Sequence, residues 1–188
     1  MGARKTNNYI IDEANMIAKI ELRRRDGENL WTIIDLDDLD RVINYPHAWY
    51  AKYSKTIQNF YAAANVHDPT GERVGTLHLH QFILNTRENH VDHINHNSLD
   101  NRKSNLREVS PSQNYRNRSG VNKNSVSGYR NVSWSKRDNK WLVQLQIDGK
   151  NVCLRKYDKE DLEEAGRFAA RMREKYYGEF AGDKQTKE

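Results

Sequence analysis

The feature that most constrains this chain is a stretch at residues 89–117 that reads NHVDHINHNSLDNRKSNLREVSPSQNYRN. An apolar-alternating segment at 90–94 predicts a short strand, and a loop rich in Asn, Ser and Asp follows it. A second short strand fits at 106–109. The run Ser-Pro-Ser-Gln at 110–113 has the order of a helix start, with serine as the N-cap and proline at the first helical position. The stretch therefore predicts strand, long loop, strand and helix.

Within it, an Asp-His pair at 92–93, an Asn-Leu-Arg run at 105–107 and Asn114 on the expected helix follow one another in a fixed order. This order resembles the HNH nucleases, above all their phage and intron-associated branch, almost without a break over residues 91–114. The resemblance implies a ββα-metal core and metal-dependent hydrolysis of a DNA phosphodiester that leaves a 5′ phosphate and a 3′ hydroxyl. It also implies a homing-type endonuclease, and one motif per chain predicts nicking of one strand.

Carried over by position, the resemblance gives four residues a role. His93 matches the general base that deprotonates a water, and Asn105 matches the asparagine that orients its ring. Asp92 matches a carboxylate ligand of one divalent cation, and Asn114 matches its asparagine ligand. Oxygen ligands suit a hard ion, Mg²⁺ or Mn²⁺. Each residue alone could be an ordinary solvated, turn or helix-start residue, but all four in register favour an active site.

Neighbouring residues have weaker assignments. Arg102 and Arg107 are interpreted as phosphate contacts or scaffold salt bridges. His96 stands where relatives usually have glycine and is expected to be exposed, the alternative being contact with the DNA backbone. His80 matches a recurrent histidine of the relatives and is expected beside the site, whereas Gln81 departs from their pattern.

Basic residues concentrate in one part of the chain. Residues 101–157 hold 13 of the 31 Lys and Arg but only three of the 26 Asp and Glu, within a chain of net charge +5. A block of this kind is typical of a nucleic-acid binder. Only 36% of the 188 residues are hydrophobic and 30% are charged, which favours small domains over one large core.

The compartment is indicated by what the sequence lacks. A single cysteine, Cys153, excludes an intrachain disulfide and fits a reducing cell interior. No run is apolar enough to span a membrane, and the first residues have no signal-peptide pattern. We expect a cytoplasmic protein of a bacterial or phage-infected cell, with double-stranded DNA as its partner, no membrane association, and a monomer rather than a homodimer.

Residues 1–78 predict a β-rich N-terminal module, mostly antiparallel, whose function is not legible. Apolar residues over 9–22 favour strands and alternate at 16–22, and an Asp-Gly turn and a returning strand at 30–36 then predict a hairpin. The acidic run at 35–40 is interpreted as the solvated face of a short helix, the alternative being a second metal site. The aromatic residues that follow are assigned to the core rather than to base stacking.

Residues 128–181 predict a further module after a polar linker at 119–127, and 182–188 form a tail expected to be disordered. Three strands with alternating apolar residues precede a helix that begins after Asp158 and stops at Gly178. The pattern predicts a three-stranded antiparallel sheet with one helix on its apolar face.

The other face of this sheet is expected to be polar and basic. From YRNVSW to YYGEFA the sequence resembles the ethylene-response-factor (AP-two) DNA-binding domain, although Asn131 replaces its usual glycine. The resemblance implies that side chains on this face read base edges in a major groove. A solvated face and a flexible linker are the plain alternatives. The predicted DNA contacts of the whole chain are Arg102, Arg107, Arg116, Arg118, Lys123, Arg130, Trp134, Lys136, Gln144, Gln146, Asn151 and Arg155.

The sequence thus predicts an α+β protein with a β-rich N-terminal module at 1–78, an HNH nuclease core at 79–118 and an AP-two-like module at 128–181. The predicted function is that of a metal-dependent, site-specific DNA endonuclease. The main alternative is a DNA-binding regulator with an inactive HNH scaffold, which predicts metal-independent binding without cleavage. An RNA-directed nuclease is a weaker alternative, because the basic block lacks the exposed aromatic platform expected for single strands.

Overall fold

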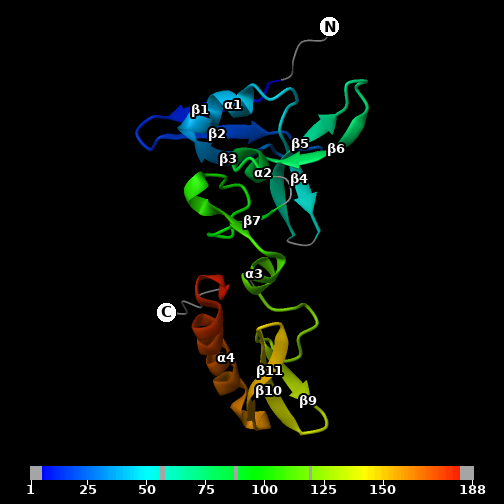
Figure 1. The fold of residues 1–188 in the computed structure, drawn as a ribbon, viewed down its shortest axis with the longest axis vertical. Coiled ribbons are helices and arrows are strands. Elements are labelled where there is room, and N and C mark those ends of the chain that lie inside the picture. The colour runs from blue at the N-terminus through cyan, green and yellow to red at the C-terminus, as the bar shows by residue number, and fades with distance from the viewer. Residues whose placement is uncertain (1–5, 56–57, 87–88, 119, 183–188) are drawn as a thin grey trace. The chain divides into compact units, whose positions relative to one another are not determined.

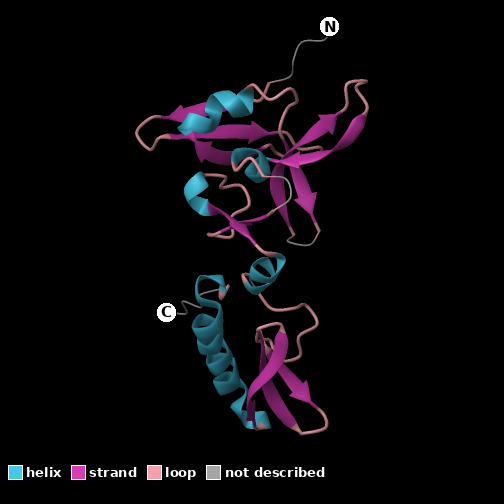
Figure 2. Cartoon of the chain, viewed as in Figure 1, coloured by secondary structure: helices cyan, strands magenta, loops and turns pink. Residues whose placement is uncertain are grey.

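The computed structural model describes residues 6–55, 58–86, 89–118 and 120–182, and these residues form an α+β fold with four small antiparallel sheets (Figure 1). Helices are few and short apart from the last long one (Figure 2). The chain divides into two compact units, Met1–Ser110 and Pro111–Glu188. The predicted module boundaries remain predictions, and the one at 78/79 falls inside the first unit.

The first unit contains three sheets, with strand orders β1-β2-β3, β4-β5-β6 and β7-β8. Its elements are β1 (Tyr9–Asp12), β2 (Ile17–Leu22), β3 (Leu30–Asp35), a 3-10 turn (Leu36–Asp38), α1 (Leu39–Ile43), β4 (Tyr50–Ser54), β5 (Asn59–His67), β6 (Arg73–His78), α2 (Leu79–Ile83), β7 (His90–His93), a 3-10 turn (Lys103–Asn105) and β8 (Leu106–Val109).

The predicted hairpin near the N-terminus is confirmed. Strands β2 and β3 pair antiparallel, with Ala18 opposite Ile34 and Ile20 opposite Thr32. Paired residues lie on the same face of a sheet, so the apolar alternation of the sequence places all four against the core, where each is 0% exposed. The apolar residues at 9–22, which favour strands, form β1 and β2 with a turn between them.

One hydrophobic core holds the first unit together. It contains Ile20 and Ile34 from the first sheet, Leu79 from α2, and Leu106 from β8, and half-buried Leu99 packs against it. Residues of the predicted N-terminal module and of the nuclease-like stretch therefore share a single core. Burial of this shared apolar surface is what holds the short β7–β8 pair in place, because an isolated two-stranded sheet is marginally stable in water.

The predicted order of strand, loop, strand and helix is confirmed for residues 89–117. Strands β7 and β8 pair antiparallel in the register Asp92 to Arg107 and His93 to Leu106. The helix that follows is α3 (Pro111–Arg116), and it belongs to the second unit.

The second unit also contains the predicted sheet and helix, in strand order β11-β10-β9. After α3 its elements are β9 (Val132–Ser135), β10 (Lys140–Ile147), β11 (Lys150–Tyr157), a 3-10 turn (Lys159–Asp161), α4 (Leu162–Tyr177) and a 3-10 turn (Gly178–Phe180). Val143 and Leu145 of β10 are buried in one cluster with Ala165 and Ala169 of α4. The helix ends at Gly178, as predicted, with the left-handed φ of +55° that favours glycine.

Two departures from the resembled families have a common explanation. His96 has φ of +60° and Asn131 has φ of +65°, which is the left-handed region where glycine is favoured. Asparagine tolerates this region better than most residues. The Asn131 side chain also donates a hydrogen bond to the carbonyl of Gln144 at 2.9 Å, and this bond ties β9 to β10.

Gly166 allows a close approach between α4 and the segment before β9. A methyl group added at Gly166 would lie 2.4 Å from Cδ1 and 2.5 Å from Cε1 of the Tyr129 ring. Real side-chain carbons do not come this close, so the ring could not keep its position against any larger residue. Within the described part of the chain, no helix has the length and apolar character needed to cross a membrane.

Candidate active site

The β7–β8 pair buries the two central residues of the motif. His93 is 6% exposed and Asp92 is 8% exposed. Across the pair, Arg107 donates from Nε and Nη2 to Oδ2 of Asp92 at 2.9 and 2.8 Å. Of the two interpretations of Arg107, the structure shows the salt bridge, and its partner is the predicted metal ligand.

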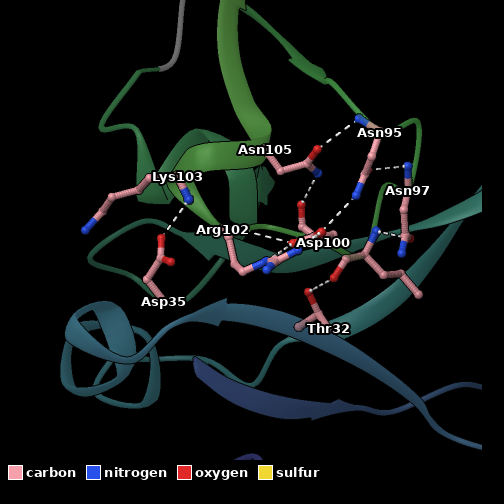
Figure 3. A network of polar contacts seen from close by, with 9 residues as sticks. Thr32, Asp35, Asn95, Asn97, Asp100, Arg102, Lys103 and Asn105 are labelled. Atoms are coloured by element: carbon pink, nitrogen blue, oxygen red, sulfur yellow. Dashed lines mark hydrogen bonds and ion pairs between the residues drawn. The ribbon is translucent and has the colours of Figure 1, made fainter. Parts of the chain in front are cut away.

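The loop between the strands is ordered by its own polar side chains (Figure 3). Asn105 accepts a bond from the backbone N–H of Asn95 at 2.9 Å and donates to the carbonyl of Asp100 at 2.7 Å. Asn95 in turn donates to the Asp100 carboxylate at 2.8 Å and accepts from the N–H of Asn97 at 2.9 Å. The loop has no regular pairing between backbone groups, and these side-chain hydrogen bonds take its place.

Asp100 is the centre of this network and is 3% exposed. Arg102 donates to both of its oxygens, from Nε at 2.8 Å and from Nη2 at 2.6 Å. The side-chain bond from Arg102 is the main reason that the pKa of Asp100 is below its usual value. Arg102, like Arg107, therefore forms a salt bridge within the fold.

Strand β3 supports the loop from outside. The backbone N–H of Ile33 donates to the carbonyl of Leu99, and the N–H of Asn101 donates to the carbonyl of Ile33, both at 2.8 Å. The hydroxyl of Thr32 donates to the same Leu99 carbonyl at 2.8 Å. Residues of the predicted N-terminal module are thus hydrogen-bonded directly to the nuclease-like loop (Figure 3).

The acidic run at the end of β3 is exposed at Asp37 and Asp40, as expected, but not throughout. Asp38 is 4% exposed, so the interpretation as a solvated helix face is wrong for this residue. Lys103 of the loop places its ammonium group 3.0 Å from Asp37 and 2.9 Å from Asp38, and its backbone N–H donates to Asp35 at 2.7 Å. The run anchors the loop, a tertiary role that local sequence cannot reveal.

Aromatic rings surround His93. The ring of His80 lies edge-on to it with centroids 5.2 Å apart, which confirms the expected position of His80 beside the site. The ring of Tyr61 lies 6.1 Å away, and His78 stacks on His80 at 5.3 Å.

Both buried histidines are held neutral near pH 7. Burial lowers the pKa of His93, although a contact with Asn101 and the charges of Asp92 and Asp100 act in the opposite direction. Burial, with the charges of His93 and His78, lowers the pKa of His80 to about 3. A neutral imidazole is the form that can accept a proton.

The asparagine that contacts the His93 ring is Asn101, which the sequence did not single out. Nε2 of His93 lies 3.3 Å from Oδ1 of Asn101, while the side chain of Asn105 bonds within the loop. The role assigned to Asn105 from the sequence, orienting the ring through the strand pair, stays a prediction, and its side-chain bonds hold the loop that joins the two strands. Asn114 lies on α3, in the second unit.

The second unit has an open groove of ≈ 650 Å³ beside its sheet. Four of its lining residues are cationic, and none of the described lining residues carries a carboxylate. Seven of the predicted DNA contacts line it: Arg116, Arg118, Arg130, Trp134, Lys136, Gln144 and Gln146. The structure therefore gathers residues of the linker and of the sheet at one surface.

One predicted DNA contact, Arg155, does not lie on the polar face of the sheet. Arg155 pairs with Val143, whose side chain faces α4, and its guanidinium lies over the rings of Tyr157 and Phe168, at 4.8 and 5.7 Å. A bulge between Val143 and Gln144 reverses the alternation of β11, so the predicted position of Arg155 on the polar face is wrong.

Arg130 lines the groove, and its predicted contact with DNA stays a prediction. It donates to the carbonyl of Arg116 at 2.9 Å and to that of Ala181 at 3.3 Å. Arg130 thereby links a segment near the start of the second unit to one near its end. Trp134 packs edge-on against Trp141 at 4.8 Å on the core side, while it also lines the groove. Asn151 pairs with Gln146 on the polar face, as predicted, and Lys123 is exposed.

The geometry can now be set against known proteins. Residues 87–116 match the sequence profile of the HNH endonuclease family. The matched segment contains β7, the loop, β8 and α3, and with them all four predicted site residues. The likeness therefore covers the motif itself.

A viral protein gives a second match. The chain is 31% identical over 120 residues to the Uncharacterized HNH endonuclease L560 of Acanthamoeba polyphaga mimivirus. The aligned part covers 60% of each protein, so the chain spans less than two thirds of that relative. No solved structure matches the chain.

Several residues of the site were missed by the sequence analysis. Thr32 and Tyr61 come from strands far from the motif, and no local pattern marks them. Asn101 and Asp100 lie inside the motif, between its named residues, so the Asp-Asn-Arg run at 100–102 was a usable signal.

Proposed function

We propose that this protein is a metal-dependent DNA endonuclease of the HNH type. The observation that carries the proposal is the buried Asp92–His93 pair on the β7–β8 sheet, inside the segment that matches the HNH endonuclease family. His93 is neutral and faces an amide oxygen, so its ring can serve as a general base.

The chemistry follows from these groups. A water attacks the scissile phosphorus while His93 accepts the water proton. The bond between phosphorus and the 3′ oxygen breaks, and the departing oxygen takes a proton from solvent water, which leaves a 5′ phosphate and a 3′ hydroxyl. The loop network, through Asp100 and Asn105, holds the strand ends that carry His93. A fixed position of the catalytic group matters for the rate, because displacing such a group by about 1 Å can lower the reaction rate on the order of 10²-fold.

The carboxylate of Asp92 is the kind of oxygen ligand that suits a hard divalent cation, Mg²⁺ or Mn²⁺. Asp92 presents a carboxylate beside the base, and Asn114 is the predicted amide-oxygen ligand on α3. When bound, the cation supplies charge stabilisation for the phosphate and the departing oxygen. Arg107 bonds Oδ2 of Asp92 and so fixes the direction of this carboxylate.

We assign duplex DNA binding to the cationic groove and the polar sheet face of the second unit. Arg116, Arg118 and Lys136 can contact phosphates, and Gln144 and Gln146 present amides that can bond base edges. The finer assignment is a homing-type, site-specific enzyme that acts as a monomer and nicks one strand, in the cell interior. The AP-two resemblance supports the mode of binding.

A regulator with an inactive nuclease scaffold is the second candidate. It is favoured by one observation, the two bonds from Arg107 to the carboxylate that should hold the cation. The two candidates separate in a plasmid assay. Supercoiled DNA is incubated with the full chain and Mg²⁺ or Mn²⁺, beside EDTA and an Asp92→Ala variant.

The endonuclease predicts open circles that require both metal and Asp92. Linear product without a nicked intermediate would replace the monomeric nicking assignment with paired active sites. Retardation of the same DNA on a gel, unaffected by EDTA and with no cleavage, would favour the regulator.

A further inference from the structure

A chain of three buried side chains connects β3 to the histidine of the site. Asn101 is 1% exposed and Thr32 is 0% exposed. The amide nitrogen of Asn101 donates to Oγ1 of Thr32 at 2.7 Å, and Oδ1 of the same amide lies 3.3 Å from Nε2 of His93. Thr32 itself donates to the carbonyl of Leu99 at 2.8 Å.

The direction of every bond in this chain is fixed by its far end. The Leu99 carbonyl can only accept, so the single hydroxyl proton of Thr32 is used there. The oxygen of Thr32 must then accept from Asn101, which turns the amide nitrogen towards β3 and the amide oxygen towards His93. An amide oxygen is only an acceptor, so Nε2 of His93 must carry the proton.

We propose that Thr32 and Asn101 are positioning residues that hold His93 as its Nε2–H tautomer and leave Nδ1 as the basic nitrogen. Nδ1 forms no hydrogen bond with any described residue, so it is available for the attacking water. The proposal rests on the proposed endonuclease function. It gives Thr32, which the sequence places in the N-terminal module, a role at the active site.

Backbone hydrogen bonds hold this hydrogen-bonded series of side chains in place. Two bonds between Ile33 and its neighbours on the loop, one to Leu99 and one from Asn101, bracket the Thr32 and Asn101 side chains. Both side chains are buried, so water cannot easily replace either bond. Because one polar partner left unsatisfied in such a place is costly, the arrangement has one favoured set of donors and acceptors.

The experiment removes only the hydroxyl. Thr32→Val keeps the shape of the side chain, Thr32→Ser restores the hydroxyl without the methyl group, and Thr76→Val on β6 is the matched control. Each full-length variant is examined by long-range ¹H–¹⁵N correlation of the His93 ring, which distinguishes a protonated from a bare nitrogen. Steady-state cleavage with Mg²⁺ gives kcat and KM.

We expect wild type, Thr32→Ser and Thr76→Val to show a protonated Nε2 and a bare Nδ1. Thr32→Val should mix the tautomers and lower kcat on the order of tenfold with KM unchanged, as other outer partners of a catalytic group do. Asn101→Ala should have the same signature and a larger effect.

Two outcomes would overturn the inference. One is a wild-type ring with its proton on Nδ1, and the other is a Thr32→Val ring and kcat indistinguishable from wild type. The ring spectrum is read without DNA, so it remains informative if no variant cleaves. In that case the endonuclease proposal fails while the tautomer assignment stands or falls by the spectrum.

Discussion

Replacing Gly166 by alanine has two opposite effects on the stability of the second unit, and the size of each is known. Alanine is favoured over glycine within a helix by about 0.8–1.0 kcal/mol, so the change would ordinarily stabilise α4. Here the new methyl group would lie 2.4–2.7 Å from three carbons of the Tyr129 ring. Forcing a methyl group into such a packed contact costs typically about 1–3 kcal/mol. Because the methyl group meets a half-buried ring that cannot simply move away, we expect a cost in the upper half of that range, which leaves a net destabilisation of about 1–2 kcal/mol.

The assay must resolve the two units, since they need not unfold together. Hydrogen exchange of α4 peptides, measured by mass spectrometry on the full chain, reports the free energy of opening for the second unit. Gly166→Ala should lower it, and the same change in a Tyr129→Ala background should raise it towards the helix-propensity value. Tyr129 also lines the cationic groove, so Gly166→Ala should weaken DNA binding. A single variant more stable than wild type would refute the packing argument.

Three further predictions concern the first unit. The acid limb of the cleavage-rate profile should have its midpoint below the ordinary histidine pKa of about 6.5, because burial lowers the pKa of His93 and the neutral ring is required; a midpoint above it would contradict this. The pKa of Asp100 is lower in the folded protein than in the unfolded chain, so the ionised carboxylate stabilises the fold above its unfolded-state pKa, and this contribution is lost as the pH falls through the folded-state pKa. Asp100→Asn should remove that part of the pH dependence of the unfolding free energy, measured by urea titration of the first unit. His96→Gly should relieve its left-handed backbone and leave the unfolding free energy unchanged or higher by up to about 1 kcal/mol, with unchanged DNA affinity. Weaker DNA binding by that variant would show that His96 contacts the backbone of the DNA.

Local patterns predicted most elements because each signal is carried by neighbouring residues. The alternation in β2, β3 and β10 and the stop at Gly178 depend on nothing distant. A position such as Asn131 could be flagged from sequence as a replaced glycine, but only the structure shows that it occupies the left-handed region.

The errors all came from tertiary contacts or a change of register. The side of Arg155 depends on one bulge, which reverses every residue beyond it. The role of Asp38 depends on Lys103, which is far away in sequence. The contact of Asn101 with His93 was missed, since asparagines close together in the motif cannot be told apart by spacing.

The central claim is that His93 acts in chemistry and not in binding. The most direct test is single-turnover cleavage of end-labelled duplex DNA, with wild type and His93→Ala at saturating protein and with Mg²⁺, Mn²⁺ or EDTA. The account predicts equal occupancy of the duplex by both proteins, and cleavage only by wild type with metal. Cleavage by His93→Ala at the wild-type rate, or a saturated wild-type complex that never cleaves with either metal, would contradict it.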